Sequence, residues 1–281
     1  TAKRDATLAA PINQNGFTDY TYQGEVFANG RYQYINPPAP LNQWVQCFWQ
    51  LDTPAGRFVY RSIPDNNVDC IFNLNNTREN LVVPPFYSAK HFEFVGPVSY
   101  FGIRFRVLAQ RAFTVVPVGD WGSASPLDLF GSAVVSAIAE QVETATFFHQ
   151  RCASAAETLL ENIHAINIDQ RLNRFIQHAY QFASTDLVLS EAQCAEFALS
   201  SRHLRRLCQQ EMGLSPKQLI RVLRFQKTLH VMKSNPRTNP AWADHYYDQP
   251  HFNREFKSLT GLTPKEFLNS SVLYNKLDEP S

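Results

Sequence analysis

The sequence predicts a multidomain α+β protein with a β-rich N-terminal domain (residues 1–125), a helical linker (126–168) and an all-α C-terminal domain (169–270). Between residues 20 and 122, aromatic and β-branched segments are interrupted by Pro, Gly or Asn about every ten residues, which is typical of a β sandwich or barrel. After Ser125-Pro126 the chain becomes alanine-rich, with apolar residues at helical spacing. The 281 residues, 44% of them hydrophobic, are enough to form two cores.

Four segments of the N-terminal domain have the residue types of β-strands. They are residues 44–49, 58–60, 68–74 and 100–107. In the last segment, apolar residues alternate with Gly102, Arg104 and Arg106, which is the period of a half-buried strand. We therefore expect one face of this strand to point into the core and both arginines to point the other way.

The linker is predicted to contain two helices, at residues 127–143 and 153–166, because both segments are nearly free of Gly and Pro. Leu159, Ile163 and Ile166 form an apolar stripe on the second helix. Such a stripe can pack on the β domain of the same chain or form the seam of a dimer, and the sequence leaves both open.

The C-terminal domain contains an internal repeat with an offset of 48 residues, which aligns residues 200–217 with residues 248–265. Each copy has a helix N-cap residue, a helix of about three turns, a Gly suited to the left-handed C-terminal position and a Pro that opens the next helix. The aligned pairs are Ser200 with Asp248, Gly213 with Gly261, and Pro216 with Pro264. Two copies of one unit are far more specific than a single copy.

The main helix of each copy carries a polar stripe opposite its buried side. A short helix precedes each one (residues 191–198 and 240–244), and a longer helix (216–233) joins the copies. The sequence thus predicts helix, tight turn and polar-faced helix twice, at about 190–211 and 239–260. Arg, Asn, Gln and His can hydrogen bond to base edges, whereas Lys contacts phosphate. The candidate base-facing residues are Arg202, Arg205, Arg206, Gln209, Gln249, Pro250, His251, Asn253 and Arg254, and the phosphate candidate is Lys257.

A basic stripe on one helix is often only a solvated face, but its recurrence at the same phase in both copies favours DNA binding. The segment Ser200-Ser201-Arg202-x-Leu204-x-Arg206, together with residues 213–216, 246–257 and 261–264, resembles the paired helix-turn-helix domain of AraC/XylS-type bacterial transcription regulators. The resemblance covers about 100 residues, from 169 to 267. It implies that the helices starting at Ser201 and Gln249 enter successive major-groove turns on one face of DNA.

Three positions depart from the family pattern. His245 stands where the family usually has Gly in the second turn, Pro240 replaces a buried aliphatic residue, and Gln193 replaces an apolar residue in the first motif. Proline is tolerated at a first helical position, so the second scaffold helix is expected to start late and be short. These departures bear on half-site geometry and on whether the second unit is impaired, more than on the fold.

The run Val95-Gly96-Pro97-Val98 and residues 100–105 are similar to the cupin-like (jelly-roll or half-barrel) N-terminal domains of some of these regulators. The resemblance implies a domain that senses an effector or mediates dimerisation. An aromatic-rich barrel interior suits an apolar or aromatic effector, with Arg104 or Arg106 pairing an acid group. The candidate pocket residues are Trp44, Trp49, Phe72, Tyr100, Arg104, Phe105 and Arg106. The same aromatic residues also suit an ordinary core.

The sequence lacks the signature motifs of several other classes of protein. The five cysteines are scattered without a C-x-x-C pair, which indicates free thiols in a reducing cytoplasm. His91 is the single histidine between residues 20 and 122, too few for a catalytic metal site, and there is no P-loop, dinucleotide fingerprint or G-x-S-x-G elbow. We therefore expect no catalytic residue, metal or cofactor, and no enzyme activity. No run approaches the roughly 20 apolar residues of a membrane helix, so no export and no membrane partner are expected.

Charge is distributed unevenly along the chain. Residues 1–168 contain 11 Lys and Arg against 14 Asp and Glu, whereas residues 169–281 contain 15 against 11. The basic C-terminal part suggests a polyanionic partner. We therefore predict a cytoplasmic transcription regulator that binds double-stranded promoter or operator DNA and is controlled by a small-molecule effector. A homodimer, and RNA polymerase as partner of an activator, stay open, as do an N-terminal domain that only dimerises or binds protein and, less favoured, a cupin-like enzyme.

Overall fold

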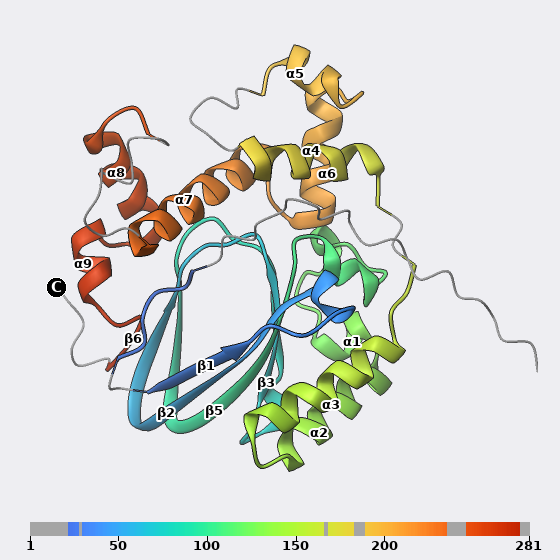
Figure 1. Ribbon diagram of the computed structural model, residues 1–281, viewed down its shortest axis with the longest axis vertical. Helices are drawn as coiled ribbons and strands as arrows, with labels where there is room; N and C mark the ends of the chain where they lie inside the picture. Colours follow the sequence, from blue (N-terminus) through green and yellow to red (C-terminus); the bar gives the residue numbers. More distant parts are fainter. Residues whose placement is uncertain (1–21, 28–29, 166–167, 183–188, 235–245, 276–281) are drawn as a thin grey trace, which may run out of the picture.

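The computed structural model describes residues 22–27, 30–165, 168–182, 189–234 and 246–275. Its N-terminal part is an antiparallel β-sheet and its C-terminal part is helical (Figure 1), which confirms the predicted fold class at this level. In the described residues the sheet has six strands, in the order β1-β2-β5-β3-β4, with β6 paired to β2. The strands are β1 (Arg31–Ile35), β2 (Val45–Ser62), β3 (Val68–Asn73), β4 (Leu81–Val83), β5 (Lys90–Phe105) and β6 (Leu273–Asn275).

Two long strands dominate the sheet, β2 with 18 residues and β5 with 16. The segments 44–49 and 58–60, expected as strands, both fall in β2 except for Trp44, and they belong to one continuous strand rather than two. The register of β2 against β5 shifts between Thr53 and Gly56, so a β-bulge accommodates Pro54 without ending the strand. Opposite the bulge, a Cβ on Gly96 would lie 2.0 Å from the carbonyl oxygen of Pro54, so only glycine fits there.

The two faces of β5 are both covered in its second half, which corrects the expectation of a half-buried strand. Phe101, Ile103 and Phe105 are at most 1% exposed and face a core formed with helices. Arg104, on the opposite face, is also buried. Arg106 lies beyond the end of the strand, where its Nε donates to the carbonyl oxygen of Asn42 at 2.6 Å. The two arginines therefore occupy different environments.

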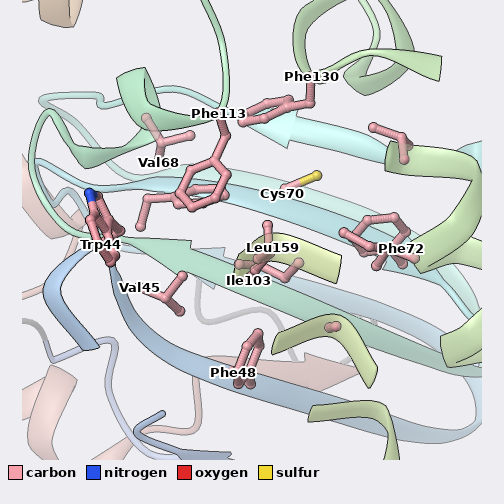
Figure 2. Close-up of a cluster of buried hydrophobic side chains, with 14 of the residues drawn as sticks. Trp44, Val45, Phe48, Val68, Cys70, Phe72, Ile103, Phe113, Phe130 and Leu159 are labelled. Carbon is pink, nitrogen blue, oxygen red and sulfur yellow. The ribbon is translucent and has the colours of Figure 1, made fainter. Parts of the chain in front are cut away.

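Three helices pack on the face of the sheet that carries Phe101: α1 (Pro126–Phe130), α2 (Ser132–Thr144) and α3 (Phe148–Glu161). Figure 2 shows the core between them, in which Leu159 approaches Ile103 and Phe48 comes from β2. Gly131, at φ 85°, separates α1 from α2, so the predicted helix 127–143 is two helices.

The apolar stripe of the second predicted linker helix packs on the β domain of its own chain. Leu159 is 2% exposed in the sheet-facing core, and Ile163 packs against the same core. Ile166 lies outside the described residues. Of the two interpretations left open by the sequence, the described contacts of Leu159 and Ile163 match the intramolecular one.

The C-terminal part consists of helices that Figure 1 shows grouped away from α1, α2 and α3. They are α4 (Gln170–Phe182), α5 (Glu191–Glu196), α6 (Ser201–Met212), α7 (Pro216–Ser234), α8 (Gln249–Thr260) and α9 (Pro264–Asn269). Within the described chain, no helix is both long enough and apolar enough to cross a membrane.

The helical part shares its cores with the sheet. One core joins α4, α5, α6 and α7 to Val107 and Leu108, and a second joins α7, α8 and α9 to Ile63. The segment after α9 returns to the sheet as β6 and pairs with residues 58–60 of β2. Because these contacts are buried and cross between the two parts, the helical part is packed directly against the β domain.

Candidate nucleic-acid interface and effector cavity

The first helix-turn-helix unit is built from local capping interactions. Ser190 and Gln193 form a capping box at the start of α5, in which each side chain bonds the backbone N–H of the other. This box explains why a polar residue occupies position 193. The turn after α5 places Ala198 at φ 56°, and Ser200 then caps α6 by accepting from the N–H of His203 at 3.2 Å.

The second unit repeats these caps at the predicted offset. Asp248 accepts from the N–H of His251 at 2.6 Å at the start of α8, and α8 ends at Gly261 with φ 80°, as α6 ends at Gly213 with φ 69°. Both helices have 12 residues. Pro240 and His245, together with the expected helix at 240–244, lie outside the described residues.

The candidate base-facing residues of α6 all lie on its exposed side. Arg202 and Arg205 take part in none of the described hydrogen bonds or ion pairs. Arg206 donates from Nη1 to Oε1 of Gln210 at 3.1 Å, while its Nη2 lies 3.0 Å from Nε2 of His203. Gln209 donates to the carbonyl oxygen of Gly213 at 3.1 Å, so its side chain caps the end of α6.

The candidates on α8 divide into an exposed group and one partly covered residue. Gln249, Pro250, Asn253, Arg254 and Lys257 are exposed. His251 is half-buried: its ring meets Tyr246 edge-on with centroids 5.6 Å apart, and its Nε2 lies 3.9 Å from a carboxylate oxygen of Glu255. The side chain of His251 thus packs against Tyr246 and Glu255 rather than pointing fully into solvent.

Sequence reasoning missed the side chains that orient α8. Glu255 accepts from Nη2 of Arg224 on α7 at 2.7 Å and lies 3.5 Å from Nε of Arg221. The guanidinium of Arg224 also stacks 5.0 Å from the ring centre of Tyr246. Burial opposes the charge of Arg224, but Glu255 outweighs burial and holds its pKa above the ordinary value. The sequence did offer one signal for these contacts: Glu255, an acidic residue, directly follows Arg254 in an otherwise basic stripe.

The C-terminal end of α6 touches the β domain. A 3₁₀ turn, η4 (Val118–Asp120), packs against it. Nε of Arg111 forms an ion pair with Glu211 on α6 at 3.0 Å, and burial raises the pKa of that glutamate. Asp120 lines a shallow groove together with Arg202, Arg205, Arg206 and Gln209. The basic stripe of α6 therefore faces solvent beside an acidic residue of the other part.

A cavity of about 340 Å³ lies on the face of the sheet opposite α1, α2 and α3. Among the predicted pocket residues, Trp49, Tyr100 and Arg104 line it. Phe72 and Phe105 do not, because their positions in the strands direct them into the core on the other face. Trp44, just before β2, lies in that same core, and Arg106 lies away from the cavity. The lining that sequence reasoning missed comprises Tyr32, Leu51, Tyr60, Ser62, Asp69, Ile71, Leu81, Val83, His91, Phe92, Glu93 and Phe94.

Arg104 is already paired within the protein. Its Nη2 donates to Asp69 at 2.8 Å and its Nε bridges both oxygens of Asp69 at 3.1 Å. Asp65 lies 3.6 Å from Nη2, and the indole N–H of Trp49 donates to Asp69 at 2.8 Å. Burial disfavours the charge on Arg104, but the carboxylates outweigh burial and raise its pKa well above the usual value. The expectation that Arg104 offers a free charge to an acidic effector needs revision.

The loop at residues 64–67 joins the cavity to the helical part. Next to Asp65, the side chain of Asn66 donates to the carbonyl oxygen of Leu219 on α7 at 3.2 Å. The carbonyl oxygen of Pro64 accepts from Nε2 of Gln226, also on α7, at 2.8 Å. Asp65 faces Arg104 at the base of the cavity, and the adjacent residues Pro64 and Asn66 bond to α7. This loop therefore connects the cavity directly to the helix that lies between the two helix-turn-helix units.

The sequence comparisons agree with the geometry of the helical part. Residues 193–270 match the family model described as a helix-turn-helix domain. Residues 193–270 are thus a helix-turn-helix domain, as the resemblance to AraC/XylS-type regulators implies. Residues 33–125, within the β domain, match a domain of unknown function (DUF6597).

Two curated relatives each match about 100 residues of the chain. The HTH-type transcriptional activator RhaS of Escherichia fergusonii is 32% identical over 102 residues, which is 36% of this chain and 36% of RhaS. RhaS of Klebsiella pneumoniae (strain 342) is 27% identical over 104 residues, 36% of this chain and 37% of RhaS. The match thus spans little more than a third of either relative.

Solved structures of ToxT from Vibrio cholerae are similar over most of the chain. One at 1.65 Å resolution has a TM-score of 0.43 and 12% identity, covering 85% of this chain and 98% of ToxT. A second, bound to (E)-4-(8-methylnaphthalen-1-yl)but-3-enoic acid, has the same TM-score and coverage with 14% identity.

Within the described part of our chain, no group of three or more His, Cys, Asp or Glu side chains is placed to hold a metal ion.

Proposed function

We propose that this protein is a cytoplasmic transcription regulator that binds double-stranded DNA sequence-specifically and has no enzyme activity of its own. The repeated unit carries this proposal: α6 and α8 have the same length, the same N-cap and C-cap positions and an exposed basic stripe at the same phase. The helix-turn-helix match and the RhaS relatives, which are transcriptional activators, support it.

The exposed side chains have two roles in the proposed DNA binding, contact with base edges and contact with phosphate. Arg202, Arg205 and Arg254 form none of the described intramolecular bonds, so they are available to base edges without losing a partner. Lys257 contacts phosphate. Most of the affinity then comes from phosphate neutralisation and falls steeply with salt, whereas the two stripes supply the choice of sequence.

Control by a small molecule in the β domain is the second part of the proposal. It is supported by the 340 Å³ cavity with largely aromatic walls and by the loop at residues 64–67, which links the cavity floor to α7. A molecule bound in the cavity shifts DNA affinity only if its own affinity differs between the DNA-bound and the DNA-free protein.

Selection of bound duplexes from a random DNA library with the purified full chain tests the proposal. The winning duplex and a scrambled duplex are then titrated by fluorescence anisotropy at two salt concentrations. We expect two short conserved blocks about one helical turn apart, and a preference over the scramble on the order of a thousandfold. Enrichment of one block would restrict recognition to one unit, and no preference with or without cell extract would contradict the proposal.

Matched charge variants separate recognition from general electrostatics. The variant R205A/R254A removes one arginine from each stripe. The control R31A/R57A removes the same charge from exposed positions of the β domain. We expect the first to lower the preference for the selected duplex by about 10-fold or more, and the control to leave that preference unchanged.

A further inference from the structure

We propose that the cavity in the β domain binds an uncharged, largely aromatic or apolar small molecule that carries one hydrogen-bond acceptor, and that it discriminates against carboxylic acids. This inference rests on effector control as part of the proposed function and adds the chemical class of the effector. It is carried by the contrast between aromatic walls and a floor whose charges are already paired.

The walls of the cavity are suited to a flat, apolar ligand. Tyr32, Trp49, Tyr60, Phe94 and Tyr100 all line it, and the volume of about 340 Å³ is within the range of small-molecule sites. Burial raises the pKa of Tyr60 to about 12, and it also raises the pKa of Tyr32, so both phenols are neutral at physiological pH. These aromatic residues therefore contribute apolar surface and ring faces and no charge. His91 and Glu93, the lining residues of β5 that can carry charge outside the floor, are exposed to solvent.

The positive charge on the floor is already paired, because Arg104 faces the carboxylates of Asp69 at 2.8 Å and Asp65 at 3.6 Å. Asp69 accepts two hydrogen bonds at each oxygen: Oδ1 from Trp49 Nε1 and Arg104 Nε, and Oδ2 from Nε and Nη2 of Arg104. A carboxylate has about four acceptor sites, so this one is saturated. The side chains of Arg104 and Asp69 are both only 9% exposed, which makes separation of the pair costly.

One donor remains on this otherwise satisfied floor. Nη1 of Arg104 forms none of the described hydrogen bonds, whereas Nε and Nη2 are both used by Asp69. A carbonyl, ether or hydroxyl oxygen of a ligand can accept from Nη1 without disturbing the pair. The buried guanidinium thus selects for an acceptor group at one end of an apolar molecule.

A carboxylate and an organic cation should both bind more weakly than a neutral ligand, each for a different reason. A carboxylate placed near Nη1 also meets the carboxylate of Asp69, and it gains little from a guanidinium that is already neutralised. An organic cation gains from the ring faces but approaches the positive charge of Arg104, and the oxygens of Asp69 already accept from three N–H groups. The floor therefore favours a neutral partner over either ion.

The test uses three probes of nearly equal shape on the full-length protein: 2-acetylnaphthalene, 2-naphthoate and 2-naphthylmethylammonium. Binding is measured at neutral pH by calorimetry and by quenching of tryptophan fluorescence. We expect the neutral ketone to bind at least tenfold more tightly than either ion. Equal or tighter binding of the acid or the amine, or no binding of the ketone, would overturn the proposal.

The variant D69N tests the stated cause. It keeps an acceptor for Trp49 but removes the nearer of the two carboxylates that face Arg104, leaving Asp65 at 3.6 Å, so the affinity for 2-naphthoate should rise at least tenfold relative to that for 2-acetylnaphthalene. The control E157Q removes a negative charge from the exposed side of α3 and should leave both affinities unchanged. If D69N does not fold by circular dichroism, the wild-type series with the three probes still decides.

The two levels of proposal fail in different ways. Probe binding is measured without DNA, so its failure leaves sequence-specific DNA binding untouched. DNA selection is performed without a probe, so its failure leaves the ligand class of the cavity untouched.

Discussion

Gly119 lies directly against the carbonyl oxygen of Gln209: a Cβ on Gly119 would lie 2.7 Å from that oxygen and 3.0 Å from the carbonyl oxygen of Gln210. Gly119 belongs to the β domain, and Gln209 is on the last turn of α6. The C-terminal end of the first candidate recognition helix is therefore in backbone contact with the other part of the protein. This contact can close only because position 119 has no side chain.

Replacing Gly119 by Ala should weaken the docking of α6. The new methyl group meets backbone atoms, which cannot move aside as a flexible side chain could, so we expect a loss of about 1–3 kcal/mol in the free energy of unfolding. Urea unfolding followed by circular dichroism measures the loss. Ser123→Ala, at a nearby exposed position, is the control, and an equal stability of G119A and S123A would refute the contact.

Local signals made the helix-turn-helix units predictable from sequence. Ser200 and Asp248 act as caps within three residues, and Gly213 and Gly261 end their helices by their own conformation, so neither requires knowledge of the fold. The repeat then placed both exposed stripes. The strands around 44–107 were located for the same reason, from their residue types.

Contacts between distant residues were not predictable in this way. Asp69 pairs with Arg104 across two neighbouring strands, and the register that brings them together depends on the whole sheet. The sequence also did not show that Trp44 and Phe72 face the helix-covered core, while Trp49 faces the cavity. A proline in β2 suggested a break, but the bulge that accommodates it is defined by the partner strand.

Replacing Ala198 by Gly should stabilise the protein. Ala198 adopts φ 56° in the turn between α5 and α6, a conformation that costs an L-residue about 1 kcal/mol or more, whereas glycine adopts it freely. The larger entropy of unfolded glycine removes part of this gain, so we expect about 0.5–1 kcal/mol in urea unfolding. Ala195→Gly, in the last turn of α5, is the matched control and should instead cost about 0.5–1 kcal/mol. Destabilisation by A198G would contradict the prediction.

Replacing Lys257 by Ala should weaken binding to all DNA sequences alike. Its exposed side chain on α8 is assigned to phosphate, so its loss should lower the slope of log affinity against log salt by about one unit. Anisotropy titrations with the selected and the scrambled duplex at several salt concentrations measure this slope. Arg57→Ala is the control with the same change of net charge. A loss confined to the selected duplex would assign Lys257 to base reading.

Asp169, directly before α4, should make the stability of the helical part sensitive to acid. It accepts hydrogen bonds from the backbone N–H, Nε and Nη2 of Arg171, and the side-chain hydrogen bond from Arg171 lowers its pKa to about 2. Because this folded pKa lies below the ordinary value, the stabilisation is fully present above about pH 4 and is lost as the pH falls toward 2. The difference in unfolding free energy between the wild type and D169N should therefore close over this range. A difference that is constant from pH 5 to pH 2 would rule out the assignment.

Gln226 holds the helical part on the β domain, and its loss should be costly. At 2% exposure, its Nε2 donates to the carbonyl oxygens of Pro64 and Tyr22, and its Oε1 accepts from the N–H of Tyr22. Gln226→Ala leaves these buried backbone groups without their partner, so we expect a loss of about 2–4 kcal/mol in urea unfolding. Gln181→Ala, on the exposed side of α4, should stay within about 0.5 kcal/mol of the wild type. If Q226A were as stable as Q181A, residues 64–67 would not anchor α7, and the route from the cavity to the DNA-binding helices would have to run through Val107 and Leu108 instead.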